Sequence, residues 1–348
     1  MKNDNLIKAG ILALLLIVTS VVSWEFYLRD KALPDSYDDG EELWSDKRAM
    51  VYEPADKATV IIGSSRNKYD FDIETWHSIT GDHLIQLSLE GNSPLHVLDD
   101  LANDNAFKGK LIIDVTEGLF FSTKPENNEE PKKRITYYHQ RSPAQRFSFE
   151  VNHFLESQFV FLDKSNFSLN ALLSGIKIAN RSGVFVFPDF PLEFERVTFG
   201  RQDIMMDKFL VDTNLQNMVK GNWDFFRKMN KEPPASGAKL DSILTTVKTN
   251  CHKIKSRGGE IIFVRTPSSG PYLAGEKKGF PRALYWDKLL SITNCPGIHF
   301  EDYPAIDHFQ CPEFSHLKHA DAIIFTKNII IILEKEKGWK FPYKQTEQ

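Results

Sequence analysis

Residues 58–67 read ATVIIGSSRN, an apolar run that ends in glycine, two hydroxyl side chains and a guanidinium. A short β-rich run of this kind, closed by Gly63, predicts a buried strand followed by a turn. This turn has two interpretations. It is either an ordinary strand-to-loop connection, or a loop that holds a serine nucleophile at the end of a sheet.

Short β-rich runs recur along the chain and alternate with stretches of helical spacing. Further runs of the first kind are 83–89, 109–115, 259–265 and 297–301, each bounded by glycine, asparagine or proline. Apolar residues at intervals of three and four mark stretches within Leu95 to Leu101, Leu240 to Ile254 and Leu317 to Lys337. Strands alternating with helices predict an α/β fold whose parallel sheet is covered on both faces. Such a sheet carries its chemistry at the carboxyl ends of its strands.

The interval 120–235 interrupts this alternation. It is rich in phenylalanine and polar residues, and contains the charged loop KPENNEEPKKR and the segment GVFVFPDFPLEF. We interpret it as a partly helical insertion between the third and fourth strands that covers one side of a pocket. Its phenylalanines either line a groove for a sugar chain or pack in the core, which is the commoner place for phenylalanine.

The N-terminus predicts a membrane anchor over residues 1–29. Lys2 and Lys8 precede a nearly uncharged stretch, 9–24, which flanking apolar residues extend to the length of a spanning helix. The positive-inside rule places the N-terminus in the cytoplasm and everything after Tyr27 outside the inner (cytoplasmic) membrane, on the periplasmic side. Because the residues before Trp24 loosely resemble a cleavage pattern, a removed signal peptide is the alternative. The acidic, polar segment 30–56 reads as a tether.

We expect residues 57–340 to form one α/β domain with an insertion, a size that the length and composition allow. The 348 residues are 41% hydrophobic, and their net charge is −4 without a long basic stretch, which argues against a nucleic-acid surface. Three cysteines are present; we expect either a disulfide between Cys295 and Cys311 or three reduced, buried thiols. His77, His83 and His96 lack metal-site spacing and no phosphate-binding glycine loop is present, so neither a metal nor a cofactor is expected.

Ser65 is the candidate nucleophile. It lies at the carboxyl end of the first predicted strand and near the start of the next helix, where backbone N–H groups favour a developing oxyanion. The G-x-S-x-G elbow of the α/β-hydrolases is absent, because Asn67 stands where the second glycine would be. That family is therefore disfavoured.

The candidate base is His316, within CPEFSHLKHADAIIFT at 311–326. A histidine in a loop beside the sheet's carboxyl edge can reach a serine on the first strand, and Glu313 can orient it. The plain alternative is a surface helix start capped by Ser315. Asp307-His308 is a rival acid–base pair, ranked lower because it does not directly precede the final helix.

Together, Ser65 in GSSR, Gly91 in SLEGNSP and Glu313-x-x-His316 resemble the ordered blocks of the SGNH (GDSL-like) hydrolase superfamily. The resemblance implies a three-layer α/β/α domain with a five-stranded parallel, flavodoxin-like sheet. It also implies that Ser65 is the nucleophile, that the N–H groups of Ser65 and Gly91 form an oxyanion hole, that His316 is the general base and that Glu313 orients it.

Three positions depart from that pattern. Ser64 replaces the usual aspartate of the first block, and Glu313 replaces the commoner aspartate of the last. The third block normally supplies an oxyanion asparagine, whereas this chain reads DVTEGLFF at 114–121, with Thr116 or Glu117 in that region. Losing one oxyanion donor lowers the rate by about two to three orders of magnitude.

The anchor and the departures are similar to the extracytoplasmic SGNH-like proteins that act with membrane-bound O-acyltransferases on cell-surface polysaccharides or teichoic acids. This implies an acyl transferase or esterase, a polysaccharide or other glycan substrate and a multi-spanning membrane partner. A non-catalytic glycan-binding or scaffold protein is the main alternative, and a secreted lipase is a third. Arg66 and Arg265 are candidate substrate-binding residues, with structural pairing as the alternative use of an arginine in a turn.

Overall fold

The computed structural model describes residues 2–30, 36–54, 57–163, 167, 169–174, 176 and 188–342. The chain divides into two compact units. The smaller unit comprises 1–38 and 142–186, and the larger comprises 39–141 and 187–348.

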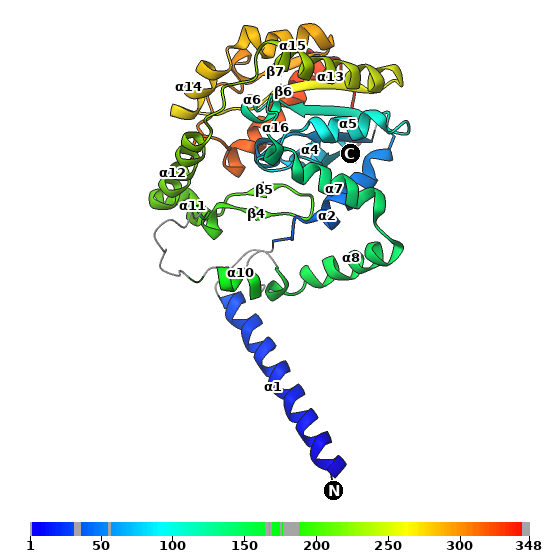
Figure 1. Ribbon diagram of the computed structural model, residues 1–348, viewed down its shortest axis with the longest axis vertical. Coiled ribbons are helices and arrows are strands. Elements are labelled where there is room, and N and C mark those ends of the chain that lie inside the picture. Colours follow the sequence, from blue (N-terminus) through cyan, green and yellow to red (C-terminus); the bar gives the residue numbers. More distant parts are fainter. Residues whose placement is uncertain are drawn as a thin grey trace, which may run out of the picture. The chain divides into compact units, whose positions relative to one another are not determined.

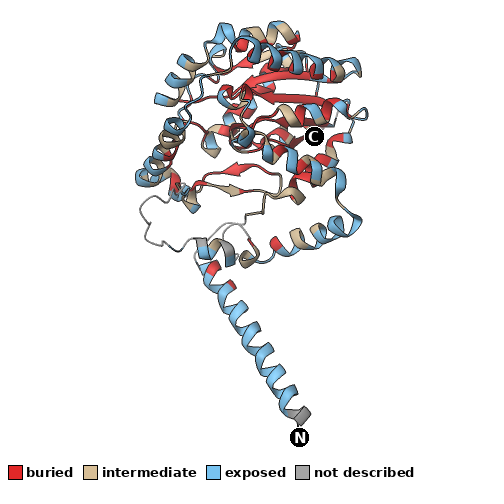
Figure 2. Ribbon diagram, viewed as in Figure 1, coloured by how far each residue is buried: buried red, intermediate tan, exposed pale blue. Residues whose placement is uncertain are grey.

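The larger unit is an α/β fold built on a five-stranded parallel sheet (Figure 1). Its strands are β1 (Ala58–Ile62), β2 (His83–Gln86), β3 (Lys110–Asp114), β6 (Glu260–Arg265) and β7 (Gly297–His299), in the order β2-β1-β3-β6-β7. Each corresponds to one of the predicted β-rich runs. Figure 2 shows the strands almost wholly buried, which explains why they read as continuous apolar runs rather than as alternating ones.

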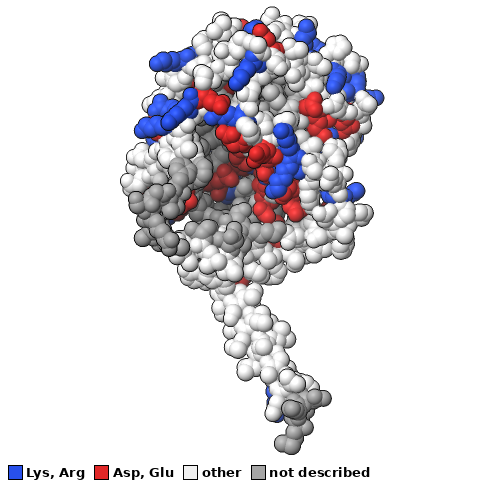
Figure 3. Space-filling view, in the orientation of Figure 1, with Lys and Arg blue, Asp and Glu red and all other residues white. Residues whose placement is uncertain are grey.

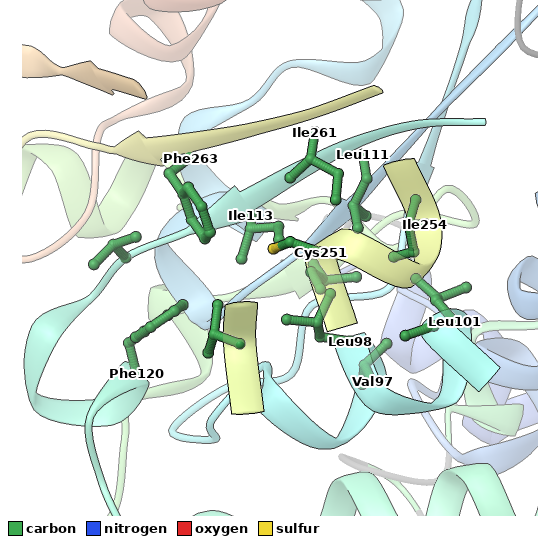
Figure 4. Close-up of a cluster of buried hydrophobic side chains, with 14 of the residues drawn as sticks. Val97, Leu98, Leu101, Leu111, Ile113, Phe120, Cys251, Ile254, Ile261 and Phe263 are labelled. Carbon is green, nitrogen blue, oxygen red and sulfur yellow. The ribbon is translucent and has the colours of Figure 1, made fainter. Parts of the chain in front are cut away.

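Two hydrophobic clusters receive alternate residues of the same strands. Val60 and Ile62 of β1 belong to a cluster that includes residues of α5 (Leu95–Asn103), α13 (Gly237–Ser256) and α15 (Trp286–Thr293), part of which is drawn in Figure 4. Ile61 belongs to a second cluster with residues of α4 (Ile73–Thr80) and α16 (His319–Lys335). Because side chains alternate across a strand, this division means that both faces of β1 are packed.

Of the two alternatives for the cysteines, the structure has three free, buried thiols rather than a disulfide. The predicted pair of Cys295 and Cys311 is wrong in this structure. Cys295 lies with Cys251 in the first cluster, whereas Cys311 lies in the second. Flanking positions in the sequence therefore do not bring these two sulfurs together.

Residues 41–49, which fall within the predicted tether, form helix α2 (Glu41–Ala49) of the larger unit. Leu43 and Trp44 are buried, and the Trp44 indole N–H donates to the carbonyl of Leu87 at 3.1 Å. Arg48 is fully buried and pairs with Asp100 of α5 and with Asp104, which follows that helix. The segment is highly charged, which favours the tether interpretation, but it also has a short apolar face that packs on the larger unit.

The long segment between β3 and β6 contains elements of both units. The larger unit receives α6 (Glu117–Phe120), η2 (Pro125–Asn127), α7 (Glu129–Gln140), η4 (Leu192–Phe194), the antiparallel pair β4 (Arg196–Val197) and β5 (Asp203–Ile204), α11 (Asp207–Val211) and α12 (Thr213–Met229). The smaller receives α8 (Pro143–Glu156), η3 (Val160–Leu162) and α10 (Leu169–Ser174). Part of the predicted phenylalanine-rich segment, 183–187, lies outside the described residues. The remaining short elements are η1 (Met50–Tyr52), α3 (Ser65–Asp70), α14 (Gly270–Gly279), η5 (Arg282–Leu284) and η6 (Phe300–Asp302).

The smaller unit begins with α1 (Lys2–Asp30), a single apolar helix. By length and composition, its segment Asn5–Asp30 is able to cross a membrane, and none of its most apolar window is buried within the protein. Figure 3 shows the helix free of charged side chains along most of its length. The predicted N-terminal apolar helix is thus present.

Candidate active site

The loop after β1 positions Ser65. Gly63 lies so close to β3 that a Cβ atom there would come within 2.4 Å of the Asp114 Cβ, so only glycine fits without a shift. Ser64 follows in an extended conformation, and its hydroxyl donates to Asp114 at 2.9 Å. Ser65 is then the first residue of α3, half-buried at the carboxyl end of β1.

Ser65, His316 and Glu313 form one hydrogen-bonded chain. The Ser65 Oγ lies 2.8 Å from the His316 Nε2, and the His316 Nδ1 lies 3.0 Å from the Glu313 Oε1. The same carboxylate oxygen accepts the backbone N–H of His316 at 2.6 Å. The structure therefore brings together the three residues expected to form a nucleophile, a base and an orienting carboxylate.

The polarity of this chain follows from the chemistry of its members. A carboxylate only accepts hydrogen bonds, so Glu313 assigns the imidazole proton of His316 to Nδ1. The Nε2 lone pair then faces the Ser65 hydroxyl, as a general base requires. His316 is 2% exposed and Glu313 is fully buried, which keeps water from competing for these hydrogen bonds.

Trp223 of α12 is a further residue of this site, and sequence reasoning did not find it. Its indole Nε1–H donates to the second carboxylate oxygen of Glu313. Its ring centroid lies 5.9 Å from that of His316, and the rings of Tyr69 and Phe194 lie at 4.4 and 6.0 Å. The inserted segment thus supplies a hydrogen-bond donor and, together with Tyr69 of α3, an aromatic wall. The only sequence signal was the aromatic content of the insertion.

Backbone strain and packing hold the loop that carries Glu313 and His316. Phe314 has a φ of 81°, in the left-handed region that a bulky residue rarely adopts. Its carbonyl accepts the N–H of Ser269 at 2.9 Å, and the Arg66 Nε donates to the Ser315 hydroxyl at 3.3 Å. Such strain persists only where the surroundings stabilise it, and it concentrates at functional sites.

Arg66 and Arg265 occupy a buried cluster of ion pairs. Arg66 is 1% exposed and pairs with Glu276, which also lies 2.5 Å from Arg265. Burial alone raises the pKa of Glu276, but the two guanidiniums outweigh it and lower that pKa to about 2. Both arginines are therefore engaged within the protein, which corresponds to the structural-pairing alternative rather than to exposed substrate contacts.

The region after β3, where the SGNH pattern has an asparagine, is also structural. The Thr116 hydroxyl donates to Asp114 at 2.8 Å and lies 2.8 Å from the Ser64 hydroxyl. Glu117 pairs with Arg265 at 3.1 Å. Burial raises the pKa of Glu117, against the opposing effect of Arg265. The negative charge of Glu117 is thus paired with a guanidinium.

Gly91 adopts a φ of 65°, which favours glycine, and a Cβ there would meet no atom within 4 Å. Its carbonyl accepts the side-chain N–H of Asn127 at 2.8 Å, while the carbonyl of Asn127 accepts the N–H of Ser93 at 2.8 Å. Among the described residues, no hydrogen bond joins Gly91 to the Ser65–His316 pair. Asn127, which also follows β3, fixes the loop around Gly91 from the side.

A second charged cluster surrounds Lys68, which is fully buried. Oxygens of Glu90, Glu195 and Asp203 lie within 4.8 Å of one another, the spacing of a cation site. However, the Lys68 ammonium lies 2.9 Å from Asp203 and pairs also with Glu90. The cluster is therefore organised around a cation of the protein itself.

The rival pair, Asp307 and His308, lies apart from this chain of hydrogen bonds. The His308 Nδ1 lies 3.7 Å from the Asp307 Oδ1, and both side chains are about half exposed. The Nδ1 of His308 instead faces the carbonyl of Pro304 at 3.2 Å. This pair has no hydrogen bond to Ser65 in the described part of the chain.

Comparison with known proteins does not identify the chain: no protein-family model matches it, and neither does any curated protein.

Proposed function

We propose that the protein is a membrane-anchored, extracytoplasmic acyl transferase or esterase that acts on O-acyl groups of a cell-surface carbohydrate polymer. The observation that carries the proposal is the hydrogen-bonded chain from Ser65 through His316 to Glu313 at the end of β1. We further propose that its domain is an SGNH-like, three-layer α/β/α domain with a flavodoxin-like strand order. The order β2-β1-β3-β6-β7 and the packing of both faces of β1 support this arrangement.

The reaction proceeds in two steps. The Ser65 Oγ attacks the ester carbonyl of the donor while the His316 Nε2 takes the hydroxyl proton, and the leaving alkoxide then receives that proton from His316. The acyl group now sits on Ser65. In the second step, His316 deprotonates an acceptor, which attacks the acyl-serine and restores the free hydroxyl. A sugar hydroxyl as acceptor makes the protein a transferase, and water makes it an esterase.

The remaining groups stabilise the charges of these steps. The backbone N–H groups of Ser65 and Gly91 donate to the oxyanion that forms on the carbonyl oxygen. Glu313 stabilises the imidazolium of His316, and its own position is set by four donors, two of them backbone N–H groups.

Anchoring places this chemistry at the outer face of the inner membrane. α1 supports a single-pass anchor, and Lys2 and Lys8 support a cytoplasmic N-terminus. In this arrangement a multi-spanning O-acyltransferase is the partner that delivers the acyl group, and the glycan lies on the periplasmic side.

A serine-reactive fluorophosphonate probe tests the proposal on the full-length protein in detergent. Wild type is expected to label at one serine, and Ser65→Ala and His316→Ala are expected to lose the label. The matched control Ser78→Ala, which removes a hydroxyl that donates to the carbonyl of Thr75, should label like wild type. Labelling that survives in Ser65→Ala would refute the assignment of the nucleophile.

A non-catalytic SGNH-like protein that binds a glycan or scaffolds a membrane acyltransferase is the second candidate. The feature that favours it is the region after β3, where Thr116 and Glu117 are engaged in structural contacts and no asparagine side chain stands ready for an oxyanion. Folded wild-type protein that binds a polysaccharide in a sedimentation assay, yet never reacts with the probe, would establish this candidate instead.

A further inference from the structure

Helix α8 presents a row of large apolar side chains to solvent. Phe147, Val151 and Phe154 are 71%, 43% and 61% exposed, and their spacing of four and three places them on one face. Leu155, beside them, is 37% exposed. Isolated exposed apolar residues are common on proteins, whereas a contiguous row on one helix face marks an interaction surface.

The opposite face of α8 is less exposed, and its side chains contact one another along the helix. Glu156 is buried and accepts from the Asn152 side chain at 2.7 Å, and Phe149 stacks on His153. The helix also has a complete start signal, because Ser142 forms a capping box with Gln145 and Pro143 opens the first turn. α8 is therefore a well-defined helix whose most exposed apolar side chains lie on one face.

The chain that follows α8 is bonded to the end of α1. The buried Glu25 carboxylate accepts the backbone N–H groups of Val160 and Phe161 at 3.2 and 3.1 Å. Arg29, which pairs with Glu25 at 2.6 Å, donates to the carbonyl of Gln158 at 2.5 Å. These contacts attach η3 to the last two turns of α1, directly after the apolar stretch 9–24.

The apolar surface extends along the same unit. Phe159 is 42% exposed, and the short helix α10 and the residue two positions beyond it expose further large side chains, namely Leu169, Leu172, Leu173 and Ile176. Figure 1 shows α8 lying crosswise to α1 within this unit. A helix in this orientation has its axis along the plane that α1 crosses.

We propose that the open face of α8, together with η3 and α10, lies in the boundary between headgroups and acyl chains of the bilayer that α1 spans. This inference rests on the anchoring part of the proposed function. If the apolar stretch 9–24 fills the hydrocarbon, then Glu25 and Arg29 stand at its edge, and the η3 segment bonded to them stands at headgroup level. An amphipathic helix at that level buries its apolar face in the boundary.

A bilayer, rather than a protein partner, is favoured by the continuity of this surface with α1. The chain that follows α8 is bonded to the end of α1, and the large exposed side chains are phenylalanine, leucine, valine and isoleucine. The exposed carboxylate of Glu150 lies at the edge of this row, one turn before Phe154. The unit therefore contacts the membrane by two elements, one that crosses it and one that lies in its surface.

Depth-dependent fluorescence quenching tests the inference. The full-length protein carries single cysteines in place of Phe154, Arg146 or Leu14, each labelled with an environment-sensitive nitrobenzoxadiazole dye. The three native cysteines are at most 6% exposed, so labelling is selective for the introduced one. Each labelled protein is reconstituted in vesicles of phosphatidylethanolamine and phosphatidylglycerol that contain lipids with a nitroxide at a shallow or a deep acyl position.

The dye at Phe154 is expected to be quenched several-fold more by the shallow nitroxide than the dye at Arg146, the matched control on the polar side of the same helix. The dye at Leu14, mid-way along α1, should respond most to the deep nitroxide. A deep Leu14 dye with an aqueous Phe154 dye would overturn the inference while leaving the anchor intact, and would point to a protein partner for α8. An unquenched Leu14 dye would overturn the anchor and the inference together.

Discussion

Replacing Trp223 by phenylalanine isolates the hydrogen bond that the inserted segment gives to Glu313. Phenylalanine keeps an aromatic ring against His316 but removes the Nε1–H donor. A hydrogen bond to a charged group contributes about 1.5–3 kcal/mol, and each 1.4 kcal/mol corresponds to a factor of ten in rate. Because Glu313 retains three other donors, from His316 and Ser315, the lower end of that range applies. We therefore expect a rate about tenfold below that of wild type.

The assay is the second-order rate constant for fluorophosphonate labelling, followed by steady-state hydrolysis of p-nitrophenyl acetate. Trp223→Phe is expected to lower kcat and to leave KM unchanged, because the indole orients the carboxylate and does not touch the ester. Trp286→Phe removes the same atoms from a buried tryptophan of α15 and controls for general loss of packing. Equal labelling rates in Trp223→Phe and wild type, with both proteins folded, would refute the positioning role.

Four further substitutions test the packing and electrostatics around the site. Gly91→Ala is expected to lower the free energy of unfolding by only about 1–2 kcal/mol, because Gly91 has a positive φ but a Cβ there meets no atom. Gly63→Ala is expected to lower it by about 3 kcal/mol or more, because its Cβ would overlap Asp114. Chemical unfolding measures both values, and equal losses would contradict the geometry. Burial raises the pKa of Asp70 from 3.8 to about 7, so the folded state holds a proton whose stabilising contribution is complete below about pH 4 and lost as the pH rises through 7. Asp70→Asn should therefore gain about 4 kcal/mol relative to wild type between about pH 4 and 8, and a pH-independent difference would disprove this linkage. Glu276→Gln leaves two buried guanidiniums without their shared carboxylate and should destabilise the fold by about 3–5 kcal/mol, a figure that an unchanged thermal midpoint would contradict.

The sheet was predictable because its strands are buried on both faces. Fully buried parallel strands read as short apolar runs such as 58–62, and the glycines and prolines at their ends are local signals. Parallel strands also bring their carboxyl ends to one edge, so Ser65 after β1 and His316 before α16 were expected on the same rim from chain order alone. Both signals can be read from the sequence, so they do not require knowledge of the tertiary structure.

The contacts that sequence reasoning missed join distant segments through single side chains. Trp223 reaches Glu313 across ninety positions, and Trp44 docks α2 on the carbonyl of Leu87. Neither contact has a periodicity or a motif, because one indole N–H is enough to make it. The disulfide considered between Cys295 and Cys311 is absent for a related reason. Nearness of the two residues in the sequence does not determine which hydrophobic cluster each thiol enters.

The two departures from the SGNH pattern that lie nearest the nucleophile are in contact with each other. Ser64, at the first-block position, and Thr116, after the third strand, have hydroxyls 2.8 Å apart, and each donates to the same oxygen of Asp114. Burial raises the pKa of Asp114, and three groups oppose this effect by stabilising the carboxylate. They are the guanidinium of Arg66 and the hydroxyls of Thr116 and Ser64. The two hydroxyls thus act together and join the end of β1 to the end of β3. Because Ser65 follows Ser64 directly, this junction also fixes the position of Ser65, the proposed nucleophile.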